Sequence, residues 1–133
     1  MRCRSLISSD KKLIETAKVM IMKNRAQNQR LSCTVGAALF AGNGRVYSGI
    51  NIEILNSAPT SICAEMGAIA QMVSSGTMKI KTVAAVRVDG AKWEVLQPCG
   101  ACRHIISQFG DPFIIISKTE KVKLSELYPL PIN

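Results

Sequence analysis

The sequence predicts a mixed α/β fold in which helices cover a mixed β-sheet. Segments with helical spacing of apolar residues alternate with short runs rich in β-branched residues, most clearly in the second half of the chain. The chain has 133 residues, of which 47% are hydrophobic and 20% charged, and this size suits one domain with one hydrophobic core. We therefore expect a single domain over residues 1–133, in which residues 1–8 form a loose N-terminus.

Three helices are predicted from apolar residues that recur every three or four positions. The first begins after Ser8 or Ser9, either of which can cap it, and extends to about Arg25. The second is expected at about 61–75. The third covers about 99–109 and ends at Gly110, and a last short turn lies at 124–127.

Strands are predicted from short apolar segments bounded by turn residues, at 34–40, 45–54, 82–88 and 113–117. Gly42-Asn43-Gly44 is a hairpin turn between the first two of these strands. Side chains alternate between the two faces of a strand, so Asn51 and Glu53 are expected on one common face of the second strand.

The composition also indicates in which compartment the chain is located and whether its cysteines are reduced. No apolar run is long enough to span a membrane, and no apolar segment follows the basic Met1–Arg4 as in a secretory signal. The five cysteines are an odd number, and three have metal-ligand spacing, which argues against a disulfide framework. We therefore expect a cytoplasmic protein, in a compartment that keeps thiols reduced.

The net charge of +8 is concentrated in residues 1–30, which hold eight basic and two acidic residues. A basic region of this kind can contact nucleic acid, but here no aromatic residues are interleaved to stack on bases. A solvated helix face or a subunit contact therefore explains it better, and nucleic acid is not an expected partner.

Two cysteine-containing fragments carry the chemistry, Cys63-Ala64-Glu65 and Pro98-Cys99-Gly100-Ala101-Cys102-Arg103. Three thiolates and an open fourth position that holds water are typical of a catalytic zinc site, and a nearby carboxylate can shuttle the protons of that water. This C-x-E…P-C-x-x-C pattern is typical of zinc-dependent nucleoside and nucleobase deaminases. We therefore predict one Zn²⁺ per chain, with Cys63, Cys99 and Cys102 as ligands and Glu65 as the catalytic residue.

The expected helices place these cysteines at helix starts. Free backbone N–H groups and the positive end of the helix dipole favour thiolates there. Three thiolates on Zn²⁺ leave a net negative charge, so Arg103 beside the site is a candidate to compensate it. The alternative is a structural zinc, which needs a fourth protein ligand. His104, Cys3 and Cys33 are the weaker candidates for that position.

Over about residues 9–130 the chain resembles the small zinc-dependent cytidine deaminases. Besides the zinc fragments, the resemblance rests on Val35-Gly36-Ala37-Ala38-Leu39, Gly49-Ile50-Asn51-Ile52-Glu53 and Leu127-Tyr128-Pro129. It implies a three-layer α-β-α sandwich around a mixed five-stranded sheet, usually as a homotetramer with active sites at subunit boundaries. It also implies hydrolytic deamination of cytidine and deoxycytidine to uridine and deoxyuridine with release of ammonia, in pyrimidine salvage.

The same resemblance implies roles for individual residues. Asn51 and Glu53 match the pair that hydrogen-bonds the ribose hydroxyls, and the backbone N–H of Ala64 matches a donor to the pyrimidine O2. Cys63, Cys99 and Cys102 match the zinc ligands. Glu65 matches the proton shuttle.

The departures from the family concern the substrate walls and the zinc surroundings. Cys33 and Ile132 stand where the family has aromatic residues, and Met66 replaces an arginine that steadies the thiolates. Missing aromatic walls predict a wider pocket. Blasticidin S deaminases also lack this arginine, so blasticidin S or a modified cytosine nucleoside is the alternative substrate. A polynucleotide deaminase and a non-catalytic zinc protein are the weaker hypotheses.

Overall fold

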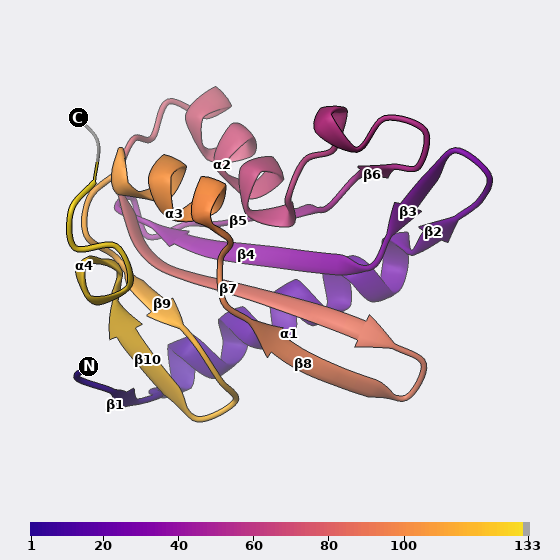
Figure 1. The fold of residues 1–133 in the computed structure, drawn as a ribbon. Helices are drawn as coiled ribbons and strands as arrows, with labels where there is room; N and C mark the ends of the chain where they lie inside the picture. Colours follow the sequence, from indigo (N-terminus) through magenta and orange to yellow (C-terminus); the bar gives the residue numbers. More distant parts are fainter. Residues whose placement is uncertain (132–133) are drawn as a thin grey trace.

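The computed structural model of the chain describes residues 1–131 (Figure 1). The helices are α1 (Ser8–Asn24), α2 (Ala64–Ser74), α3 (Gly100–Ser107) and α4 (Leu124–Leu127), with a 3-10 turn η1 (Ala58–Thr60). The strands are β1 (Arg4–Ser5), β2 (Ala26–Gln27), β3 (Leu31–Cys33), β4 (Val35–Ala41), β5 (Val46–Ile50), β6 (Glu53–Ile54), β7 (Ile80–Asp89), β8 (Lys92–Leu96), β9 (Phe113–Ile115) and β10 (Glu120–Lys123).

The main sheet has the strand order β1-β10-β9-β7-β4-β5, and β8 also pairs with β7. Its neighbouring strands run antiparallel except β7 and β9, which are parallel. The predicted mixed sheet is therefore confirmed, but it has seven strands rather than five, because β1 extends the edge and β8 pairs with the end of β7. A second, three-stranded sheet has the order β2-β3-β6.

Helix α1 covers one face of the main sheet, and α2 and α3 cover the other, so the predicted three layers are confirmed (Figure 1). Side chains of β7 point alternately to the two faces of the main sheet, so its apolar residues contribute to the core on both faces. Ala84, Val86 and Val88 pack with residues of α1. Val83 packs with residues of α2 and α3, and Ala85 packs against Ala64.

Glycines let both layers of helices approach the sheet closely. A Cβ at Gly36 in β4 would overlap the carbonyl oxygen of Ala17 in α1. A Cβ at Gly49 in β5 would lie 2.5 Å from the backbone nitrogen of Ala68 in α2. Backbone-to-backbone packing of this kind therefore sets the distance between α2 and the sheet.

The N-terminus differs from the expected loose segment. Arg4–Ser5 pairs with β10, and the backbone N–H of Arg2 donates to Glu126 at 2.8 Å. The cap of α1 is Ile7 rather than Ser8 or Ser9. The backbone N–H of Ile7 donates to the Asp10 carboxylate at 2.9 Å, so a carboxylate in the first turn satisfies the helix start.

Within the described residues, no helix is both long and apolar enough to cross a membrane. Ile132, which the family resemblance places at a substrate wall, lies outside the described residues.

Candidate functional site

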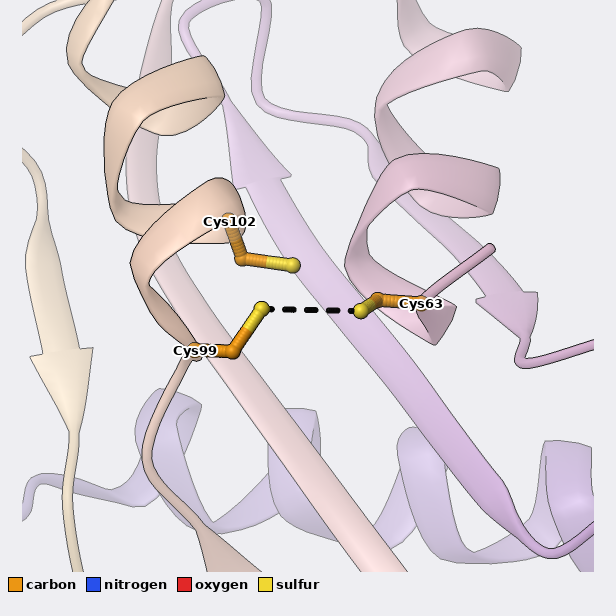
Figure 2. Close-up of side chains that lie close together, drawn as sticks. All are labelled: Cys63, Cys99 and Cys102. Atoms are coloured by element: carbon orange, nitrogen blue, oxygen red, sulfur yellow. Dashed lines mark hydrogen bonds between the residues drawn. The ribbon is translucent and has the colours of Figure 1, made fainter. Parts of the chain in front are cut away.

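The three predicted cysteine ligands lie together where α2 and α3 begin. Cys63 is the N-cap of α2, Cys99 is the N-cap of α3, and Cys102 lies in the first turn of α3 (Figure 2). Their sulfur atoms all lie within 4.8 Å of one another, and Cys63 Sγ is 3.6 Å from Cys99 Sγ. Tetrahedral zinc with Zn–S distances of about 2.3 Å needs S···S distances of about 3.8 Å. The cluster therefore fits one zinc ion.

The thiol pKa values show why the cluster needs a cation. Burial raises the pKa of Cys63 and of Cys102, and the nearby Glu65 carboxylate raises both further. Burial also acts to raise the pKa of Cys99, but the backbone N–H of Cys102, the two neighbouring thiols and the N–H of Ala101 together bring it below its ordinary value. Three thiolates at this spacing repel one another, so a bound cation would favour the ionised form of all three.

The residues around the cluster also leave a coordination position open. Among residues 1–131, no fourth His, Cys, Asp or Glu joins the group of ligand atoms. His104 Nδ1 lies 3.1 Å from the hydroxyl of Tyr128, and Cys3 is exposed in the N-terminal segment. Three protein ligands with an open position distinguish a catalytic zinc site from a structural one.

Glu65 lies in the first turn of α2, two residues after the Cys63 ligand. The residue is buried, with 6% of its surface exposed. Burial raises the pKa of the Glu65 carboxyl group above its ordinary value, and its own backbone N–H offsets part of this effect. A buried carboxyl group with a raised pKa is suited to accept and return protons near neutral pH.

A cavity of about 520 Å³ opens in front of the cysteines and falls in the size range of small-molecule sites. Its walls come from β4, β7, the end of β8 and the segment between β5 and α2. The lining residues are Val35, Asn51, Glu53, Ala58, Ser61, Ile62, Cys63, Ala64, Glu65, Arg87, Leu96, Gln97 and Cys99. A second cavity, of about 600 Å³, is lined by Asp10, Lys121 and other residues but by none of the three cysteines.

Asn51 and Glu53 both line the cavity, but not as members of one strand. Strand β5 ends at Ile50, and Glu53 belongs to β6 in the second sheet. The Asn51 side-chain oxygen accepts the backbone N–H groups of Thr34 and Val35 at 2.8 and 2.9 Å. This fixes the amide group so that its NH₂ remains available to a ligand.

Ala64 and the first turn of α2 supply backbone donors. The carbonyl of Cys63 accepts the N–H groups of Met66 and Gly67, whereas Ala64 N–H precedes the first intrahelical hydrogen bond. Ala64 is 1% exposed and lines the cavity beside Glu65. The side chain of Met66 packs against the main apolar core.

The guanidinium of Arg103, expected beside the zinc thiolates, makes its hydrogen bonds to protein oxygens. Its Nε donates to the Pro98 carbonyl at 2.9 Å, and an Nη donates to the Leu127 carbonyl at 3.0 Å. The other Nη lies 3.5 Å from the Gln97 side-chain oxygen. Within the described residues its guanidinium thus holds the segment that leads into Cys99, and makes no hydrogen bond to a ligand sulfur.

The structure does not bring Cys33 to the cavity that the cysteine ligands line. Cys33 in β3 is 4% exposed and packs with residues of α1. It lines a separate small cavity with Arg25, Ala26 and Gln27. The sequence pattern also failed to identify Arg87 and Gln97, because their place in the wall depends on strand pairing.

The fold and the cysteine cluster together define a zinc-binding α/β domain. The family model of the cytidine and deoxycytidylate deaminase zinc-binding region matches residues 7–118. The chain therefore belongs to the cytidine and deoxycytidylate deaminase family.

Individual relatives agree with this assignment. A blasticidin-S deaminase of Bacillus cereus is 34% identical over 98% of this chain and 96% of its own. A cytidine deaminase of Sporosarcina psychrophila is 39% identical over 82% of this chain and 71% of its own. The crystal structure of a cytidine deaminase from Mycobacterium leprae superimposes with a TM-score of 0.77 and 26% identity, covering 94% of this chain and 100% of that one.

Proposed function

We propose that this protein hydrolyses the amino group of cytosine nucleosides, converting cytidine and deoxycytidine to uridine and deoxyuridine with release of ammonia. The observation that carries the proposal is one cavity with three convergent thiols and no fourth protein ligand among residues 1–131, together with the buried Glu65. The cytidine deaminases among its relatives support this substrate class.

Cys63, Cys99 and Cys102 would hold the zinc ion. When bound, zinc with three protein ligands lowers the pKa of water at its open position toward neutrality. Glu65 accepts a proton from the attacking water, delivers it to ring N3, and then transfers the second proton to the departing amino group. The C4–O bond forms, the C4–N bond breaks and ammonia leaves, so atoms and charge balance.

The remaining walls orient the substrate. The free backbone N–H of Ala64 donates to the pyrimidine O2. The fixed Asn51 NH₂ donates to a ribose hydroxyl, and the Glu53 carboxylate accepts from the sugar diol. Because Asn51 and Glu53 belong to different elements, their common position in the cavity supports a sugar site more strongly than a shared strand face would.

Blasticidin S is the second candidate substrate. The Bacillus cereus relative covers almost the whole chain, and it is named for this substrate. Met66 in place of the arginine of the small cytidine deaminases fits this candidate too. The Asn51 and Glu53 pair favours a ribose-bearing nucleoside.

We also propose a homotetramer that acts in cytoplasmic pyrimidine salvage. Ile52, Leu55 and Ile62 are exposed apolar residues on the segment that forms one wall of the cavity. A second copy of the chain would cover this apolar surface and complete the wall. The reduced thiols that zinc binding requires support a cytoplasmic location.

The test is ammonia release by zinc-quantified protein from cytidine, deoxycytidine, cytosine, blasticidin S and a short single-stranded DNA. Cytidine and deoxycytidine are expected to be deaminated faster than free cytosine and the single-stranded DNA, and Asn51→Ala is expected to reduce kcat/KM for cytidine more than for free cytosine. Faster turnover of blasticidin S than of both nucleosides would replace the primary substrate assignment. No turnover of any compound would contradict the proposed function.

A further inference from the structure

Arg87 is the one basic side chain that lines the candidate active-site cavity within residues 1–131. It lies on β7 directly opposite Val35 of β4 on one side and Glu94 of β8 on the other. Ala85, two residues earlier, packs against Ala64 at the start of α2. Alternation along the strand therefore directs Arg87 to the same face of the sheet as the zinc cysteines.

The guanidinium of Arg87 has donors to spare, in contrast to that of Arg103. All three guanidinium nitrogens of Arg103 face protein oxygens. In the described part of the chain, Arg87 has only a loose ion pair with Glu94, with Nη1 3.6 Å from Oε1 and both side chains more than half exposed. Close charge-assisted hydrogen bonds are shorter, and exposed pairs of this kind are weak.

The reaction itself does not require this charge. Cytidine is neutral, and burial and its own backbone N–H, rather than Arg87, shift the pKa of Glu65. An arginine held at the rim of a substrate cavity with a loosely bound counter-ion is well suited to bind a carboxylate or a phosphate in the fork between its donors.

Gln97 can act together with Arg87. It lines the same cavity, and its side-chain oxygen faces the Arg103 guanidinium at 3.5 Å. In that orientation its NH₂ group remains available as a second, neutral donor. Glu53 and Glu65, also in the wall, are acidic side chains that an anionic substituent has to avoid, so the substituent is expected on the side of the substrate that faces β7 and β8.

We propose that Arg87 is a specificity-determining residue, and that the site prefers cytosine nucleosides that carry an anionic group, a carboxylate or a phosphate, over neutral cytidine. This inference rests on the proposed deaminase function and specifies its substrate class. Glu94 occupies the guanidinium when the substrate is absent and is displaced when the anion binds.

The experiment compares kcat/KM for cytidine, cytidine 5′-monophosphate and 5-carboxycytidine in the wild type and in Arg87→Gln. The two charged compounds place the anion on the sugar or on the base, so their ranking identifies its source. Arg87→Gln is expected to lower kcat/KM for the preferred anionic compound about tenfold more than for cytidine. This factor corresponds to the lower end of the range for a hydrogen bond to a charged group, because Arg87 is half exposed. Arg87→Lys is expected to restore part of this difference.

Two further variants control the result. Arg45→Gln removes the same charge from an exposed position that does not line the cavity, and is expected to leave the ratio of charged to neutral substrate unchanged. Glu94→Gln removes the competing carboxylate and is expected to increase the preference for the anionic compound. Zinc content and thermal unfolding verify that each variant is folded.

The outcomes separate this inference from the function on which it rests. Good turnover of cytidine, with both anionic compounds poorer and Arg87→Gln lowering all three equally, would overturn the role of Arg87 and leave the deaminase function intact. Failure of the zinc-loaded protein to deaminate any of the three would overturn both.

Discussion

Replacing Gly49 by alanine tests whether close packing of α2 on β5 positions the active site. The added Cβ would lie 2.5 Å from the backbone nitrogen of Ala68 and 2.7 Å from the carbonyl carbon of Gly67. Both neighbours are backbone atoms, so no side-chain rotation relieves the overlap. Ordinary contact begins at 3.4 Å, so α2 has to move away from the strand by about 0.9 Å.

This displacement acts directly on the chemistry, because α2 carries Cys63 at its start and Glu65 in its first turn. Overpacking of this kind costs about 1–3 kcal/mol of stability. Misplacing a catalytic group by about 1 Å lowers the rate about 100-fold. We therefore expect Gly49→Ala to lose about 100-fold in kcat and to release zinc faster to a chelator.

The assay is uridine formation per bound zinc, with urea denaturation on the same preparations. Gly67→Ala is the matched control, since its Cβ meets Ile50 at an ordinary 3.4 Å and alanine favours the helix. Gly36→Ala controls for stability alone, because it overpacks α1 on the opposite face of the sheet. If Gly49→Ala kept kcat and zinc retention within threefold of Gly67→Ala, the packing argument would be refuted.

Three other changes have defined outcomes. Asp10→Asn is expected to lower the free energy of unfolding, measured in urea, by about 3 kcal/mol. In the wild type the buried Lys121 Nζ lies 2.6 Å from the Asp10 carboxylate, and the substitution leaves it without a counter-ion. A loss below about 1 kcal/mol would contradict this prediction. Arg103→Leu is expected to weaken zinc binding about tenfold, because it removes the hydrogen bond that holds the Pro98 carbonyl. Arg103→Lys is expected to restore little of this affinity, since lysine lacks the planar fork of donors. Competition titration of zinc measures both variants, and full restoration by lysine would show that charge alone matters. Removal of zinc by a chelator is expected to lower the midpoint of thermal unfolding, and an unchanged midpoint would show that zinc does not stabilise the fold.

The zinc fragments were predictable because their geometry is local. In both, a cysteine directly precedes a helix, and the helix start itself directs the sulfur toward the common centre. Cys102 follows Cys99 by three positions, about one helical turn, so the sequence spacing already fixes their proximity. Only the approach of the two helices to each other had to come from the fold.

Other parts of the sheet carry weak sequence signals. Strand β8 (Lys92–Leu96) and strand β10 (Glu120–Lys123) mix charged with apolar residues, and neither was predicted. In β10 the charge of Lys121 is neutralised inside the protein by Asp10, a partner 111 residues away in the sequence. Tertiary pairing of this kind outweighs local β-propensity.

The residues that line the cavity were also difficult to predict from the sequence, because their positions depend on how the strands pair. Arg87 lines the cavity because β7 pairs with both β4 and β8, whereas Cys33 in β3 packs with residues of α1. Neither position follows from spacing along the chain. Asn51 and Glu53 reach the cavity although the strand that was expected to carry both ends at Ile50.

The most direct test of the account is Glu65→Gln, which keeps the shape of the side chain and removes its proton-transfer capacity. We expect the purified variant to retain one zinc per chain and a normal unfolding midpoint, with turnover of cytidine at least about 100-fold below the wild type. Near-normal turnover by the zinc-loaded variant would contradict the assignment of Glu65 as the proton shuttle, and with it the deaminase mechanism proposed for this cavity.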